Sequence, residues 1–166
     1  MVVLQKEAVS APIDVNNESF TASATKLECD YDVNPTELYQ AIEARQWQYV
    51  MNMFHTEEAD KENEIKNQEK EVSFAEQANT WVVRKEQDGR LRWRMLPLHA
   101  LMVFKAPYKV VDAILSVAPT SVNSKDDRGM VPLHLAFRHE AQDEFLSKIA
   151  QVHKKQISKS RNKLIH

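Results

Sequence analysis

Glycine and cysteine are both scarce in this chain of 166 residues, and each shortage excludes a kind of site. The two glycines, Gly89 and Gly129, stand far apart, so the chain has no glycine-rich loop that could cradle a phosphate group. Cys29 is the single cysteine, which excludes an internal disulfide and any zinc site built from several cysteines. One cysteine also fits a reducing compartment.

Long hydrophobic runs and a strong excess of one charge are missing as well. No apolar run approaches the ~18 residues of a membrane-spanning helix, and the N-terminus lacks the basic start of a signal peptide. The formal net charge is −2, so no overall field favours nucleic acid or a membrane surface. The length fits one domain, and we expect a cytoplasmic protein that at this size also has access to the nucleus.

Composition divides the chain into an arm, a domain and a tail. Residues 1–33 show no sustained periodicity and are predicted to be a disordered N-terminal arm. The domain is predicted at 34–156, and its first helical pattern follows Asn34 as N-cap, as one helix or as two broken near Arg45. Residues 157–166 are predicted to be a basic C-terminal tail. The cations in this stretch are also typical of the C-terminal end of a helix, where they interact favourably with the helix dipole.

An acidic insertion is predicted at residues 57–79 inside this domain. Between 57 and 76 there are eight acidic residues against three lysines and few apolar residues, which is typical of a solvated loop or a frayed helix. We therefore expect the insertion to lie outside the core.

A β-hairpin is predicted at residues 80–96. Apolar and basic residues alternate from Leu91 to Met95, and the pair Asp88 and Gly89 favours a tight turn. A two-residue turn there would place Trp93 beside Arg84. It would also place Lys85 opposite Arg92, and because like charges directly opposite each other are unfavourable, the register stays open.

Two histidines stand in matching contexts after the hairpin. Pro97-Leu98-His99 recurs 35 residues later as Pro132-Leu133-His134, and each tripeptide opens a pattern of two short helices and a polar loop. Such a pair could bind a metal or take part in catalysis. A repeated structural unit explains both positions at once, so we predict a structural role for the two histidines.

The run 122-VNSKDDRGMVPLHLA-136 resembles the junction between two ankyrin repeats, in which an acidic, glycine-containing turn leads into a T-P-L-H-x-A helix start. A weaker match begins at Thr36, so the resemblance covers residues 35–55 and 96–156. Leu96 and Val131 replace the usual threonine, and neither P-L-H unit has the usual glycine between its helices. The resemblance implies a mainly α fold: a short ankyrin-like helical-repeat solenoid with an inserted β-hairpin.

The resemblance also implies a function, a non-catalytic protein–protein interaction scaffold or adaptor whose partner is another protein of unknown identity. It places Asp127, Arg128 and Met130 on a junction loop, and Arg138 and His139 on the inner-helix side. The hairpin adds exposed aromatic and basic residues typical of binding hot spots: Trp81, Arg84, Arg92, Trp93 and Arg94. Alternatively, the two tryptophans simply pack the hairpin onto the repeats.

Two other classes of protein stay open. A nucleic-acid-associated accessory protein could use the basic hairpin and the C-terminal tail, and the chain could be a catalytically inactive fragment of a larger ankyrin protein.

His139-Glu140 begins a near match to the zinc motif H-E-x-x-H, but Asp143 stands where the second histidine is needed. We predict no catalytic residue, cofactor, metal, small-molecule substrate or membrane contact.

Overall fold

The computed structural model describes residues 27–63, 72–141 and 143–163. Within these residues the protein is mainly helical with a small three-stranded sheet, which confirms the predicted fold class at this level. The elements are, in chain order, β1 (Glu28–Asp30), α1 (Glu37–Glu43), α2 (Trp47–Asn63), α3 (Phe74–Ala78), β2 (Trp81–Lys85), β3 (Leu91–Met95), α4 (Pro97–Val103), α5 (Tyr108–Val117), the 3-10 helix η1 (Pro119–Asn123), α6 (Pro132–Arg138) and α7 (Asp143–Lys163).

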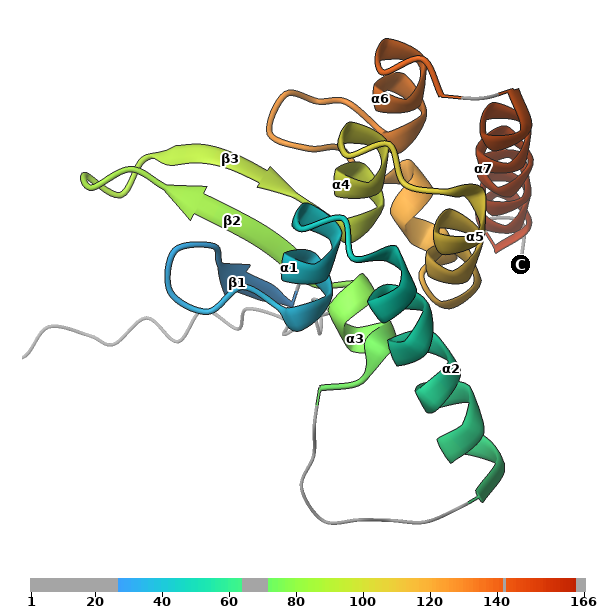
Figure 1. The fold of residues 1–166 in the computed structure, drawn as a ribbon. Helices are drawn as coiled ribbons and strands as arrows, with labels where there is room; N and C mark the ends of the chain where they lie inside the picture. The colour runs from blue at the N-terminus through green and yellow to red at the C-terminus, as the bar shows by residue number, and fades with distance from the viewer. Residues whose placement is uncertain (1–26, 64–71, 142, 164–166) are drawn as a thin grey trace, which may run out of the picture.

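Three helix pairs in the described part of the chain stack side by side (Figure 1). The helices α1, α4 and α6, called the inner helices below, form one layer, in which α4 contacts both of the others. The outer helices α2, α5 and α7 form a second layer, in which α5 contacts both of the others. The helical pattern after residue 34 is therefore two antiparallel helices, as in the second of the two predicted arrangements.

The same left-handed turn joins the two helices of every pair. Arg45, Lys105 and Glu140 have φ angles of 55°, 55° and 56°, and among the described residues no other residue except glycine has a positive φ. Each follows its inner helix by the same number of residues. A backbone N–H just after the turn donates to a carbonyl five residues earlier in each pair: Gln46 to Ala41 (2.8 Å), Ala106 to Leu101 (3.0 Å) and Ala141 to Ala136 (2.9 Å). This is the hydrogen bond of a Schellman motif, in which glycine is usual.

The inner helices begin with two kinds of cap. Thr36 caps α1, since its Oγ1 accepts a hydrogen bond from the N–H of Tyr39 at 3.3 Å, so the predicted cap at Asn34 was wrong by two residues. Leu96 and Val131 stand at the equivalent positions of α4 and α6 and have no hydroxyl. In those two helices the third residue is a histidine whose Nδ1 accepts from the N-cap N–H, which replaces half of a capping box.

The sheet has the order β1-β2-β3, with β1 parallel and β3 antiparallel to β2. Residues 28–30 therefore belong to the folded domain, and the prediction of a disordered arm up to residue 33 was wrong for them; residues 1–26 lie outside the described part. The hairpin is confirmed, and Arg84 pairs with Trp93 as a two-residue turn would require. An irregularity after Arg84 then places Lys85 opposite Leu91, which avoids the expected lysine–arginine pair.

Part of the predicted acidic insertion is packed into the domain. Helix α2 runs to Asn63, and α3 buries Phe74, Gln77 and Ala78. The side-chain Oε1 of Gln77 accepts a hydrogen bond from the N–H of Leu38 at 2.8 Å, so α3 holds the start of α1. The prediction that residues 57–76 lie outside the core was therefore wrong for Phe74, and α3 lies at the end of the insertion predicted at 57–79. Residues 64–71 of the insertion lie outside the described part.

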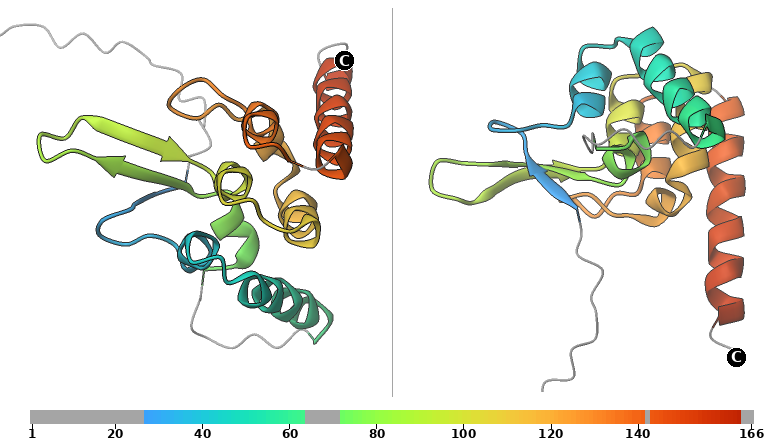
Figure 2. Two further views of the ribbon diagram at one scale, coloured as in Figure 1. Left: turned by 45° about the horizontal axis from the view of Figure 1, so that its top comes forward. Right: turned by 90° about the horizontal axis from the view of Figure 1, so that it is seen from below.

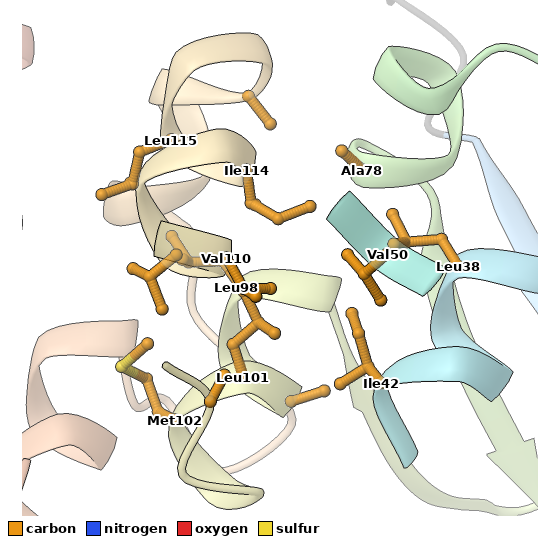
Figure 3. Close-up of a cluster of buried hydrophobic side chains, with 14 of the residues drawn as sticks. Leu38, Ile42, Val50, Ala78, Leu98, Leu101, Met102, Val110, Ile114 and Leu115 are labelled. Atoms are coloured by element: carbon orange, nitrogen blue, oxygen red, sulfur yellow. The ribbon is translucent and has the colours of Figure 1, made fainter. Parts of the chain in front are cut away.

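The core lies between the two helical layers and joins all three pairs (Figure 3). Leucine, isoleucine and valine side chains from α1, α2, α4 and α5 point toward one another there. Those with no solvent exposure include Leu38, Ile42, Val50, Leu98, Leu101, Val111 and Ile114. Helix α7 adds Ile149 and continues to Lys163, so residues 157–163 of the predicted tail are helical, and residues 164–166 lie outside the described part.

Candidate protein-binding surface

The loop between η1 and α6, residues 124–131, is called the joint loop below, and Asp126 shapes it. Its Oδ1 accepts from the N–H of Arg128 at 2.9 Å and from the N–H of Met130 at 2.7 Å. Gly129 supplies the positive φ of 75° that the turn requires. The predicted residues Arg128 and Met130 thus lie on a well-ordered tip, the first exposed and the second half-buried.

The joint loop is attached to the hairpin through Asp127. Its Oδ1 accepts a hydrogen bond from the N–H of Arg94 on β3 at 3.1 Å, and the side chain is only 17% exposed. The sequence offered Asp127 as a partner-binding residue. In the structure its carboxylate joins the joint loop to β3, and these two projecting segments lie beside each other at one edge of the molecule (Figure 2).

The hairpin divides its predicted binding residues between two faces. Trp81, Arg92 and Arg94 lie on one face, since side chains alternate along a strand and Trp81 precedes the Val82–Met95 pair by one residue. The guanidinium carbon of Arg94 lies 4.5 Å from the centroid of the Trp81 ring. Trp81 is 5% exposed and packs with Val83 and Leu96. It therefore fastens the hairpin to the helices and has no ring surface left for a partner, which favours the packing alternative for this tryptophan.

Trp93 lies on the other face, in a cluster of three aromatic rings. The ring centroids of Tyr31 and Tyr39 lie 5.1 Å and 6.1 Å from that of Trp93. Arg84 covers Tyr31 at 4.9 Å and pairs with Asp32 at 3.1 Å. Burial raises the pKa of Tyr39, so its hydroxyl stays protonated, and it donates to the sulfur of Met95 at 3.7 Å. Trp93 and Arg84 are half-buried.

Arginines near the tip of the hairpin lie beside carboxylates. Nε of Arg90 is 2.6 Å from Asp88, and Nε of Arg92 is 3.6 Å from Glu86. Both pairs are exposed, so each stabilises the fold by only ~0–1 kcal/mol. The carboxylates still reduce the positive field of the hairpin, and the nucleic-acid alternative depends on that field.

Arg138 and His139 lie at the other end of α6, away from the joint loop. Arg138 is exposed in the last turn, and His139 is the C-cap residue. His139 lines a cavity of about 390 Å3 between the α4–α5 and α6–α7 turns, together with Lys105 and Tyr108. The predicted residues therefore form no single patch: the hairpin and joint loop lie at one end of the inner helices, and Arg138 and His139 at the other.

The two repeated histidines differ in burial. His99 has no solvent exposure; its Nδ1 accepts from the N–H of Leu96 at 3.2 Å, and its Nε2 lies 3.0 Å from the carbonyl oxygen of Ser124. Because Nδ1 accepts, Nε2 carries the hydrogen and donates to the joint loop. Burial lowers the pKa of His99, so the neutral form is favoured. His134 makes the equivalent cap at 3.4 Å but is exposed.

Sequence reasoning missed the two tyrosines that pack against Trp93 and one exposed apolar residue on α6. Tyr31 and Tyr39 flank Trp93, but Tyr31 was placed in the arm, which hid the cluster. Phe137 on α6 is 62% exposed, although phenylalanine usually lies inside. It stands 35 positions after the buried Met102, so aligning the two units identifies it as an apolar residue at a packing position.

Among residues 27–63, 72–141 and 143–163, no three histidine, cysteine, aspartate or glutamate side chains gather as metal ligands. The Cys29 thiol has a raised pKa, chiefly because it is partly buried. No helix in the described part combines the length and the apolar character needed to cross a membrane.

The fold and this surface together define a mainly helical protein of stacked helix pairs with a projecting hairpin. Comparisons of the chain with protein-family models, with curated proteins and with solved structures found no match.

Proposed function

We propose that the chain is a non-catalytic binding module of ankyrin-repeat type, whose hairpin, joint loop and inner helices receive another protein. The observation that carries this proposal is the left-handed turn at Arg45, Lys105 and Glu140. It stands at the position where the ankyrin pattern has glycine, and it occurs once in each helix pair. One helix pair cannot bury its apolar face alone, whereas stacked pairs share a core and leave one layer free to bind.

The hairpin fits this proposal as an enlarged joint. It lies between α3 and α4, as the joint loop lies between η1 and α6. The third residue of an inner helix reaches the next joint in both places: Tyr39 donates to Met95 at the end of β3, and His99 donates to Ser124. The hairpin therefore extends a row of projecting joints, rather than interrupting an array as the sequence suggested.

The exposed residues of this row are the ones available to a partner. Arg92, Arg128 and Arg138 are exposed, and Trp93 on β3 is partly exposed. Arginine and tryptophan are enriched among the residues that dominate binding energy. Trp81, Arg94 and Asp127 hold the hairpin and the joint loop in place.

Affinity retention with matched charge reversals tests the proposal. The immobilised wild-type chain, Arg92→Glu, Arg138→Glu and the outer-layer control Lys109→Glu would each be exposed to extract of the native cell, once untreated and once treated with nuclease. All these side chains are exposed, so each variant should fold. We expect proteins that are retained by wild type and the control but reduced by the two arginine variants. Equal retention by all four chains contradicts the proposal, and retention that disappears with nuclease supports the nucleic-acid alternative.

A further inference from the structure

Equivalent positions in the three helix pairs can be compared directly, because the left-handed turns align them. Lys105 follows Arg45 by 60 residues, and Glu140 follows Lys105 by 35 residues. The pair α4–α5 lies in the middle of the stack and is covered on both sides. Its burial therefore shows what each end pair would bury if another helix pair were stacked on it.

The α6–α7 end of the stack leaves such packing positions open. Phe137 is 62% exposed, whereas the equivalent Met102 is 3% exposed. His134 is exposed, whereas His99 is fully buried and donates to the next joint. On α7, Ala150 is exposed where Leu115 of α5 is 3% exposed.

Helix α7 has two apolar stripes, and the second packs against the core only through Leu146. Phe145, Ile149 and Val152 recur at helical spacing and pack against the core. A second stripe runs beside it through Leu146, Ala150 and Ile157, of which Ile157 is 43% exposed. The second stripe and Phe137 together form an open face, called the α6–α7 face below.

The opposite end of the stack has an open face of its own. Tyr49 on α2 is 45% exposed, and its hydroxyl donates to a carboxylate oxygen of Glu37. Together with Met53 it lines a groove of about 590 Å3 that Val72, Phe74 and Gln77 also line. Tyr49 and Met53 are equivalent to Glu144 and Lys148 on α7. Lys148 pairs with Asp112 of the preceding outer helix at 2.7 Å. Tyr49 and Met53 therefore mark the side on which a preceding pair would stack, called the α1–α2 face below.

The two terminal outer helices differ in charge along their sequences. Residues 145–161 on α7 contain five lysines and arginines and no acidic residue, whereas residues 53–63 on α2 contain four acidic residues and one lysine. Both helices are long, with 21 and 17 residues against 10 in α5. In both, most of the charged residues lie in the C-terminal half.

We propose that the protein associates head to tail, with the α6–α7 face of one copy stacked on the α1–α2 face of the next. If two copies stack as neighbouring helix pairs stack within one chain, the basic end of α7 lies beside the acidic end of α2 in the neighbouring copy. Phe137 and Ile157 are then covered as Met102 is covered within the chain. A two-fold pairing of α6–α7 faces would instead bring two basic helices together. Because the two faces differ, the contact does not close a dimer and produces rings or filaments.

Complementary blocked variants test this proposal. Phe137→Glu blocks the α6–α7 face by placing a charge where an apolar side chain should be covered. Tyr49→Lys blocks the α1–α2 face by removing an exposed ring and adding a cation opposite the basic helix. Both sites are exposed, and circular dichroism checks that both variants fold. Sedimentation velocity of each chain would be followed from micromolar to submillimolar concentration.

We expect wild type and the control Lys109→Glu to form species beyond a dimer as concentration rises, less so at high salt. Each blocked variant should associate about tenfold more weakly or stay monomeric. An equimolar mixture of the two should form a 1:1 dimer and nothing larger, because one intact face remains on each. A monomeric wild type, or a mixture that stays monomeric, overturns the proposal. Arg92→Glu should lose the proposed protein partner and keep self-association, so the two proposals fail separately.

Discussion

Replacement of Lys105 by glycine is expected to stabilise the protein, although glycine inside a structure usually destabilises it. The φ of Lys105 is 55°, and a left-handed backbone costs an ordinary residue ~1–2 kcal/mol that glycine does not lose. Glycine gains freedom in the unfolded chain, which offsets up to about 1 kcal/mol. The Lys105 side chain is exposed. We therefore expect a net gain of roughly 0.5–1 kcal/mol in the free energy of unfolding.

Urea denaturation followed by far-ultraviolet circular dichroism measures this gain, and the same substitution at Arg45 and Glu140 should produce a similar one. Lys109→Gly is the matched control: the lysine is exposed in the first turns of α5, and the change should cost up to about 1 kcal/mol. If glycine at Lys105 destabilised the protein as much as it does at Lys109, the left-handed turn and its repetition would be refuted.

Three further predictions concern the contacts that join the units. The pKa of His99 is lowered in the folded state, so the unfolded state binds a proton at this histidine more tightly. The free energy of unfolding should therefore fall as pH decreases below about 6.5. Urea unfolding across this range should show that His99→Ala loses this pH dependence and that His134→Ala keeps it. Gln77→Ala leaves a buried N–H of α1 unpaired and should cost about 1–3 kcal/mol by the same assay, and an unchanged midpoint would contradict the role of α3. Asp127→Ala removes the acceptor of the Arg94 N–H, so hydrogen exchange at that amide should become faster while exchange in α5 stays the same.

The parts of the fold that the sequence predicted depend on local patterns. The Pro97 and Pro132 helix starts and the hairpin at Asp88 and Gly89 were found because each has a short-range signal, a helix-initiating proline or a turn dipeptide. A two-residue turn at Asp88 and Gly89 would also place Trp93 beside Arg84, as the structure has it, although the sequence left the register open. Local chemistry was enough in these places because tertiary packing agreed with it.

The remaining parts depend on contacts between distant residues. Residues 28–30 became a strand because β2 offered a free edge, and α3 became part of the core because Gln77 reaches the backbone of α1. The burial of Trp81 and the exposure of Phe137 also depend on which face of an element meets a neighbour. The missing glycines gave no warning that Lys105 and Glu140 would adopt the same turn.

Site-specific photo-crosslinking tests the proposed binding surface most directly. A photoreactive phenylalanine analogue would be introduced at Arg92, at Arg138 and, as the outer-layer control, at Lys109, all of which are exposed. After irradiation in the native cell, each chain would be recovered and its crosslinked proteins identified. We expect the same protein to be linked from positions 92 and 138 and not from position 109. A protein linked only from position 109, or equally from all three positions, would contradict binding by the hairpin and the inner helices.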